Sequence, residues 1–134
     1  RYHAIVHGVT KQEEGTIHTL IGRHPKERKK MAVRTDGGKD AVTHYRILRH
    51  MNRFTYVECV LETGRTHQIR VHMAHIGHPL LGDTVYGPKG NPFSLEGQTL
   101  HAKILGFVHP STGKYIETDA PLPEYFQNLL NKFE

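Results

Sequence analysis

The feature that most constrains this chain is a change of hydrophobic period at Gly64. Before this glycine, apolar and polar residues alternate from 55 to 62, which is the pattern of a half-buried β-strand. After it, Ile69, Met73 and Ile76 recur at helical spacing. A strand therefore enters a helix of about ten residues through a glycine turn. Such a junction places several polar side chains at one exposed rim.

Two residues of this junction invite specific expectations. We expect Thr66 to cap the helix, which leaves the backbone amides of the first turn and the positive end of the helix dipole available to an anion. Gly77 ends the helix. Arg70 lies one turn in, beside the apolar stripe, where a guanidinium is half buried and needs an anionic partner. Glu58 and Glu62 of the preceding strand are the candidates for a structural ion pair.

The rest of the chain predicts an α+β or mixed α/β fold, mainly an antiparallel sheet flanked by short helices. Alternation predicts strands at 2–9, 41–50, 55–62, 98–108 and 114–119, short extended pieces at 16–20 and 31–34 inside a long basic connection from 10 to 38, and a terminal helix at 121–133. The strands at 41–50 and 55–62 form a hairpin. The inner face of the terminal helix is predicted to comprise Leu122, Phe126, Leu129, Leu130 and Phe133. The length of 134 residues fits one domain or part of one.

Composition excludes several classes of protein. Hydrophobic residues make up 37% and charged residues 23%, which is the range of globular domains. No apolar stretch approaches the roughly 20 residues that cross a bilayer, so we expect no membrane partner. The single cysteine, Cys59, cannot form an internal disulfide and alternates within a strand as a small buried hydrophobe. Together with the absence of an apolar leader, this favours the cytoplasm.

Positive charge is concentrated in one segment. The chain carries a formal net charge of +5, and the basic run contains Arg23, Lys26, Arg28, Lys29, Lys30 and Arg34. Only Glu27 opposes this run. Such a cluster attracts phosphates through Coulomb attraction and counterion release, so we predict that these residues contact RNA phosphates. A solvated loop is the alternative.

The junction also carries a resemblance to a known family. Residues 64–70, GRTHQIR, and their continuation through HPLLGDTVYG at 78–87 resemble the third motif of the RluA family of pseudouridine synthases. The resemblance extends over nearly the whole chain: residues 1–8 resemble the tyrosine-bearing strand of the family, and residues 100–102 resemble its closing part. It is strongest for the branch that modifies large-subunit ribosomal RNA. On this resemblance we expect residues 1–134 to be the C-terminal part of a synthase catalytic domain.

This resemblance implies a reaction and a set of site residues. A uridine already in RNA is isomerised without a cofactor: the C1′–N1 bond breaks, the uracil turns and a C1′–C5 bond forms. The base must leave its stack, and the implied partner is large-subunit ribosomal RNA. By position, Tyr2 corresponds to the aromatic residue that packs on the flipped base, and Arg70 to the arginine that pairs with the catalytic aspartate. The implied substrate-binding residues are Arg65, His67, Gln68, Ile69 and Leu100.

One part of the family pattern is missing. The nucleophilic aspartate of the family belongs to a His-Arg-Leu-Asp segment before the tyrosine strand, where this chain begins. Asp36, Asp40 and Asp119 do not match it, and Asp83 is interpreted as a turn residue. We therefore expect an inactive fragment in which Tyr2 and Arg70 border a hollow that lacks a carboxylate. We also expect non-native self-association, because sheet edges and apolar surface are left uncovered.

Two other functions remain open on the residues alone. A non-catalytic RNA-binding module would keep the groove and the basic loop, and absence of an encoded upstream His-Arg-Leu-Asp segment would favour it. A small metal-dependent hydrolase would need a metal at His72, His75 and His78, which step by three residues with no cysteine or acid at ligand spacing. We expect no metal there and histidines that face solvent or phosphate.

Overall fold

The computed structural model describes residues 1–27, 29–51, 53–88, 98–108 and 110–132. Its elements are β1 (Tyr2–His7), β2 (Glu14–Arg23), β3 (Met31–Arg34), β4 (Lys39–His50), β5 (Phe54–Leu61), α1 (Gln68–His75), β6 (Leu100–Ala102), β7 (Ile104–Val108), β8 (Tyr115–Asp119) and α2 (Glu124–Lys132). All strand pairs are antiparallel. The predicted α+β fold with a mainly antiparallel sheet and short helices is confirmed.

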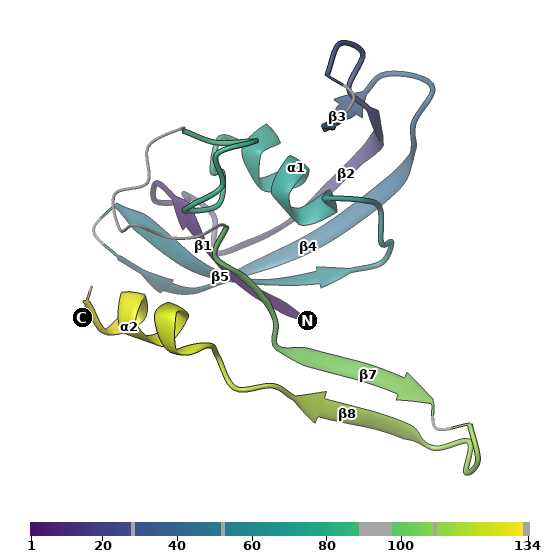
Figure 1. Ribbon diagram of the computed structural model, residues 1–134, viewed down its shortest axis with the longest axis vertical. Helices are drawn as coiled ribbons and strands as arrows, with labels where there is room; N and C mark the ends of the chain where they lie inside the picture. Colours follow the sequence, from purple (N-terminus) through teal and green to yellow (C-terminus); the bar gives the residue numbers. More distant parts are fainter. Residues whose placement is uncertain (28, 52, 89–97, 109, 133–134) are drawn as a thin grey trace.

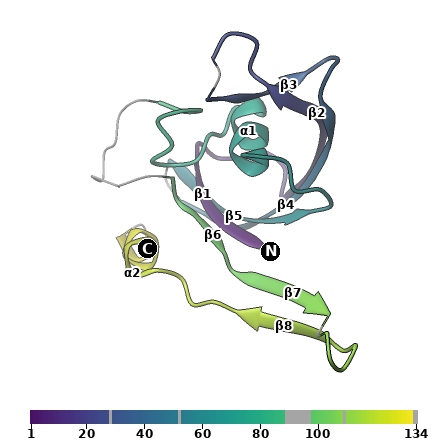
Figure 2. The same ribbon diagram turned by 45° about the vertical axis from the view of Figure 1, so that its right-hand side comes forward.

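The main sheet has six strands in the order β3-β2-β4-β5-β1-β6. It curves around α1, which lies on the concave face (Figures 1 and 2). Helix α2 lies on the opposite side of the sheet, and the β7–β8 hairpin extends away from the body (Figure 2). The sheet therefore has one face that supports the strand-to-helix junction and one face that is partly covered by α2.

The alternation of β1 places one apolar set on each face of the sheet. Ala4 and Val6 pack on the α1 side, together with Ile69 and Met73. Ile5 packs on the other side, in a cluster that contains the α2 residues Phe126, Leu129 and Leu130. β1 thus lies between the two layers of the core, because successive side chains of a strand point to opposite faces.

Two predictions about the core are confirmed. Cys59 is fully buried on the α1 side, and burial raises the pKa of its thiol to about 12. Phe126, Leu129 and Leu130 form the buried face of α2, and Leu122 packs beside them. Phe133 lies outside the described residues.

The predicted basic connection is partly wrong. It contains β2, a ten-residue strand that pairs with β4 from Glu14 to Ile21, while the short piece at 31–34 is confirmed as β3. The inward positions of β2 include Thr19, whose hydroxyl hydrogen-bonds a buried histidine, so apolar alternation alone understates the strand. Long-range pairing with β4 supplied the order that the local pattern lacks.

Two other boundaries also differ from prediction. The strand expected at 98–108 is divided at Lys103 into β6 and β7, which belong to different sheets. The amides of Lys103 and Ile104 both donate to the carbonyl of Arg1, which turns the chain out of the main sheet. α1 has eight residues, shorter than expected. No helix in the described part of the chain has the length and apolarity to cross a bilayer.

Candidate active site

The strand-to-helix junction turns at His67, and the predicted Thr66 cap is wrong. His67 is the N-cap residue and has a left-handed φ of 55°, with no side-chain cap hydrogen bond. Thr66 is exposed. The reversal is instead held by Gln68, whose Oε1 accepts hydrogen bonds from the Arg65 amide at 3.0 Å and the Thr63 hydroxyl at 2.7 Å. The turn before the helix is therefore stabilised by Gln68, the first residue of the helix, and not by the predicted cap at Thr66.

The Gln68 amide is fully used within the chain. Besides the two bonds that its oxygen accepts, its nitrogen donates to the Val42 carbonyl at 3.0 Å and to the Thr43 hydroxyl at 2.9 Å. These contacts occupy both acceptor and both donor positions of the amide, and Gln68 is only 2% exposed. Gln68 thus ties α1 to β4, and its predicted role in binding substrate stays a prediction.

Arg70 is held by Asp83, which corrects three expectations. Its Nε donates to Oδ2 of Asp83 at 2.8 Å and its Nη2 donates to Oδ1 at 3.1 Å. Of the expected partners, Glu58 instead pairs with His3 and Arg46, and Glu62 pairs with His44; Glu58 alternates with the α1-facing residues of β5. Asp83 therefore binds Arg70 in addition to its place in a turn. The surroundings of Arg70 were expected to lack a carboxylate, and they contain that of Asp83.

Asp83 is buried and ionised in this environment. Its side chain is fully shielded from solvent, and that of Arg70 is 13% exposed. Oδ1 of Asp83 also accepts the amides of Val85 and Tyr86, each at 3.1 Å. Burial opposes the charge, but the hydrogen bonds from Arg70 and from the Tyr86 and Val85 amides, together with the positive charge of Arg70, outweigh burial, so the pKa of Asp83 is lowered.

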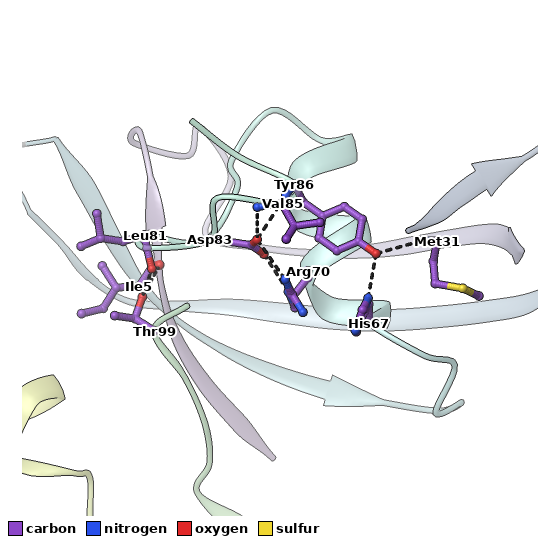
Figure 3. Close-up of polar contacts among 9 residues, drawn as sticks. All are labelled: Ile5, Met31, His67, Arg70, Leu81, Asp83, Val85, Tyr86 and Thr99. Carbon is purple, nitrogen blue, oxygen red and sulfur yellow. Dashed lines mark hydrogen bonds and ion pairs between the residues drawn. The ribbon is translucent and has the colours of Figure 1, made fainter. Parts of the chain in front are cut away.

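Tyr86 is a site residue that the sequence reasoning missed. Its hydroxyl accepts the Met31 amide at 2.9 Å and lies 2.7 Å from Nδ1 of His67 (Figure 3). Its ring centroid lies 5.0 Å from Cζ of Arg70 and 5.9 Å from Nζ of Lys30. Burial and the charge of Arg70 lower the pKa of His67, which favours its neutral form. Its position three residues after Asp83, within one motif, is the signal that could have identified it.

The loop that carries Asp83 is attached to β1. The Leu81 amide donates to the carbonyl of Ile5 at 2.8 Å, and the buried Thr99 hydroxyl contacts the carbonyls of both residues (Figure 3). The His7 amide also donates to the carbonyl of Pro79 at 2.8 Å. The strand that bears Tyr2 and the carboxylate that holds Arg70 therefore belong to one hydrogen-bonded frame.

The apolar residues of the predicted site share one cluster. Ile69 is buried between the sheet and α1, and Tyr2 and Leu100 pack, half-buried, against the same cluster. In the sheet, Tyr2 pairs with Cys59 of β5, and Leu100 pairs with Ala4 of β1. The structure thus brings the three apolar site residues to the face of the sheet on which α1 and Arg70 lie.

The basic run lies around the β2–β3 turn. Lys26 and Lys29 are exposed in this turn, and Arg28 lies outside the described residues. Arg23 is exposed at the end of β2, and Nη1 of Arg34, half-buried in β3, donates to the Arg23 carbonyl at 3.0 Å. The turn approaches the site through Lys30, Met31 and Tyr86. At the other side of the junction, Nε of Arg65 donates to the carbonyl of Asp40 at 2.7 Å.

The histidines of α1 do not behave as one group. The expectation that they face solvent or phosphate is wrong for His72, which is fully buried between the hydroxyls of Thr19 and Thr43 at 2.8 and 2.7 Å. Burial lowers the pKa of His72 to about 4. His78 contacts the carbonyl of His7. In the described ranges, no group of three or more His, Cys, Asp or Glu residues could hold a metal ion.

A separate groove of about 430 Å³ lies elsewhere on the sheet. It is lined by Glu14, Gly15, Thr16, His44, Tyr45, Arg46, Glu58 and Val60. None of the predicted site residues lines it, so this groove is distinct from the surroundings of Arg70.

Comparisons with known proteins show which family the chain resembles. The sequence profile of the RNA pseudouridylate synthase family matches residues 1–75. An uncharacterized RNA pseudouridine synthase of Bacillus subtilis, YlyB, is 54% identical over 130 residues, which cover 97% of this chain and 42% of that protein. Ribosomal large subunit pseudouridine synthase D of Pseudomonas aeruginosa is 48% identical over 142 residues. The match covers 97% of this chain and 44% of that protein.

A solved structure shows the same fold. Human RNA Pseudouridylate Synthase Domain Containing 1 superposes with a TM-score of 0.79 at 26% identity, over 98% of this chain and 64% of that one. The chain spans about two fifths of the length of the curated relatives that it matches. The matched profile, the relatives and the shared fold support the RluA-type resemblance of the junction motif. The chain belongs to the RNA pseudouridylate synthase family.

Proposed function

We propose that the protein containing this chain isomerises uridines of large-subunit ribosomal RNA to pseudouridine in the cytoplasm, with Tyr2 and Arg70 in its active site. The observation that carries the proposal is the state of Arg70. Two of its guanidinium nitrogens are bound to Asp83, while Nη1 makes no hydrogen bond to any residue in the described ranges. A half-buried guanidinium with one nitrogen to spare is suited to bind a second carboxylate.

The nucleophile in this proposal is an aspartate from outside these 134 residues. Asp83 is unsuitable, because its side chain is fully shielded and its two oxygens already accept four N–H groups. An incoming carboxylate beside Nη1 of Arg70 is kept ionised by the adjacent positive charge and is aimed by the hydrogen bond. Without that carboxylate the 134-residue chain is inactive.

The apolar cluster supplies the base-binding surface. The ring of Tyr2 packs on the flipped uracil, and Ile69 and Leu100, which share its cluster, form the apolar wall. During the reaction the C1′–N1 bond breaks and the C1′–C5 bond forms, C5 loses its proton and N1 gains one. Arg65 and His67 lie at the junction beside Arg70 and are proposed to contact the nucleotide.

The basic run adds sequence-independent affinity. Lys26 and Lys29 are exposed in the β2–β3 turn, and Lys30 of the same turn lies 5.9 Å from the Tyr86 ring that Arg70 also contacts. Phosphates of the RNA that flank the flipped base are proposed to bind there, since such contacts position the backbone without reading bases. Lys26, Lys29 and Lys30, with Arg23, Arg28 and Arg34, are the residues proposed for this role.

Tritium release from RNA that carries 5-tritiated uridine tests the proposal. The full-length protein should release tritium, and Arg70→Lys should reduce the rate by about 10²-fold or more, since one hydrogen-bonding arm and the aim of the charge are lost. Arg46→Lys is the matched control, because Arg46 also pairs with a carboxylate but lies 59% exposed in another part of the sheet.

The same assay separates the alternatives. Binding of RNA without tritium release by the full-length protein would favour a non-catalytic RNA-binding module. Tritium release by the 134-residue chain alone would show that the nucleophile lies within it. Gel filtration of that chain tests the proposed self-association, for which β3 and β6 provide the sheet edges.

A further inference from the structure

Arg70 is restrained from two directions. Asp83 binds Nε and Nη2 through two parallel hydrogen bonds, and the ring of Tyr86 lies 5.0 Å from Cζ. Figure 3 shows Arg70 reaching from α1 toward Asp83 with Tyr86 alongside. An arginine side chain has substantial rotamer freedom in solution, and a bidentate carboxylate removes much of it. The position of Nη1 is therefore set by Asp83.

Asp83 is itself restrained by its loop. Its Oδ1 accepts the amides of Val85 and Tyr86, and the Asp83 carbonyl accepts the Gly87 amide at 3.1 Å. A Cβ at Gly87 would lie 2.8 Å from that carbonyl oxygen, so the turn requires glycine there. Two residues before Asp83, Leu81 is hydrogen-bonded to β1. The carboxylate is thus tied to the strand that carries Tyr2.

We propose that Asp83 is a positioning residue of the active site, which holds the guanidinium of Arg70 so that Nη1 meets the carboxylate of the nucleophile. This inference rests on the proposed function. Asp83 does not touch substrate in this role. It acts through Arg70, and its attachment to β1 keeps Arg70 in register with the base-binding ring of Tyr2.

Asp83→Asn is the sharpest variant. The asparagine oxygen can still accept the amides of Val85 and Tyr86, so the turn is retained. Its amide nitrogen faces Nε of Arg70, where a donor meets a donor and the hydrogen bond is lost. We expect single-turnover tritium release by the full-length protein to fall by about 10²-fold, the effect of a misplaced reacting group, with the Kd for RNA nearly unchanged. Asp119→Asn is the control, since Asp119, at the end of β8, also pairs with a cation, Lys103.

The Arg70→Lys background distinguishes positioning from support of the fold. If Asp83 acts through Arg70, adding Asp83→Asn to Arg70→Lys should change the rate by less than about twofold, because the two residues form one unit. A loss of the same size in both backgrounds would assign Asp83 to the fold alone and overturn the inference. An unchanged rate in Asp83→Asn by itself would also overturn it.

A spectroscopic measurement separates this inference from the proposed function. In the full-length protein labelled with 15N-arginine, the Nε–H of Arg70 should exchange slowly with solvent, and Asp83→Asn should abolish this protection. Absence of protection in the unmodified protein would refute the restraint of Arg70 by Asp83, whatever the activity. A protected Nε–H in a full-length protein that releases no tritium would refute the proposed function. The Asp83–Arg70 pair would then have no role in catalysis.

Discussion

Two arginine–carboxylate pairs in this molecule have the same chemistry and different surroundings. Arg70 and Asp83 form two hydrogen bonds, with side chains 13% and 0% exposed, and the carboxylate is also bound to two backbone amides. Arg46 binds Glu58 through one hydrogen bond of 3.2 Å, and the Arg46 side chain is 59% exposed. Only the first pair fixes the orientation of its guanidinium. Burial and bidentate geometry make the difference between a placed group and a solvated one.

Removing each arginine should give the largest difference in stability between the two pairs. Arg70→Ala leaves the charge of Asp83 buried and unpaired, so we expect a loss of stability of about 3 kcal/mol or more. Arg46→Ala removes an exposed partner and should cost less than about 1 kcal/mol. Urea denaturation of the full-length protein measures both values. Equal losses for the two variants would show that burial does not distinguish the pairs.

The histidines show the same difference between buried and exposed polar groups. His72 is buried between two hydroxyls with a pKa lowered to about 4, so its neutral form stabilises the fold fully above pH 6.5, and this contribution is lost as the pH falls to about 4. The size is about 3 kcal/mol from a shift of this extent. His72→Gln should flatten the pH dependence of the urea midpoint in this window.

Some acid sensitivity should remain in that variant. The pKa values of His3, His7 and His67 are also lowered, with burial the largest cause of each shift. His44→Gln is the matched control, because His44 pairs with Glu62 and its side chain is 41% exposed. A pH profile unchanged by His72→Gln would contradict the assignment of a buried neutral imidazole.

Tyr86→Phe tests the Tyr86 hydroxyl, which contacts both Met31 and His67 beside the Arg70–Asp83 pair. The ring beside Arg70 is retained, but the Met31 amide and Nδ1 of His67 lose their partner. We expect a loss of about 1–2 kcal/mol in the free energy of unfolding. Tyr115→Phe is the control, since Tyr115 is 64% exposed. A Tyr86 variant as stable as the control would show that these hydrogen bonds contribute nothing.

The smallest effect on stability is expected in the basic run. Lys26→Gln with Lys29→Gln should leave unfolding unchanged, because both side chains are exposed. RNA binding should weaken, and the slope of log K against log salt should fall by about 1 for each phosphate contact removed. Lys114→Gln, exposed at the far turn of the β7–β8 hairpin, is the control. An unchanged slope would remove these lysines from the RNA interface.

Local patterns predicted much of the fold around the site. β1, the β4–β5 hairpin, β3 and the buried face of α2 follow from alternation and helical spacing, because these elements bury one regular face. β2 was underestimated because Thr19 points inward toward His72. The break between β6 and β7 depends on hydrogen bonds to the Arg1 carbonyl, a partner distant in sequence.

The family, the strand-to-helix junction and the need of Arg70 for an anionic partner can be inferred from short contiguous motifs of the sequence. Which anion binds Arg70 follows only from the assembled fold. Glu58 and Glu62 are nearby in sequence, but Glu58 pairs with His3 and Arg46 and Glu62 pairs with His44, whereas Asp83 reaches Arg70 from a loop hydrogen-bonded to β1. The physical reason is that an ion pair depends on burial and distance, and both are properties of the assembled chain.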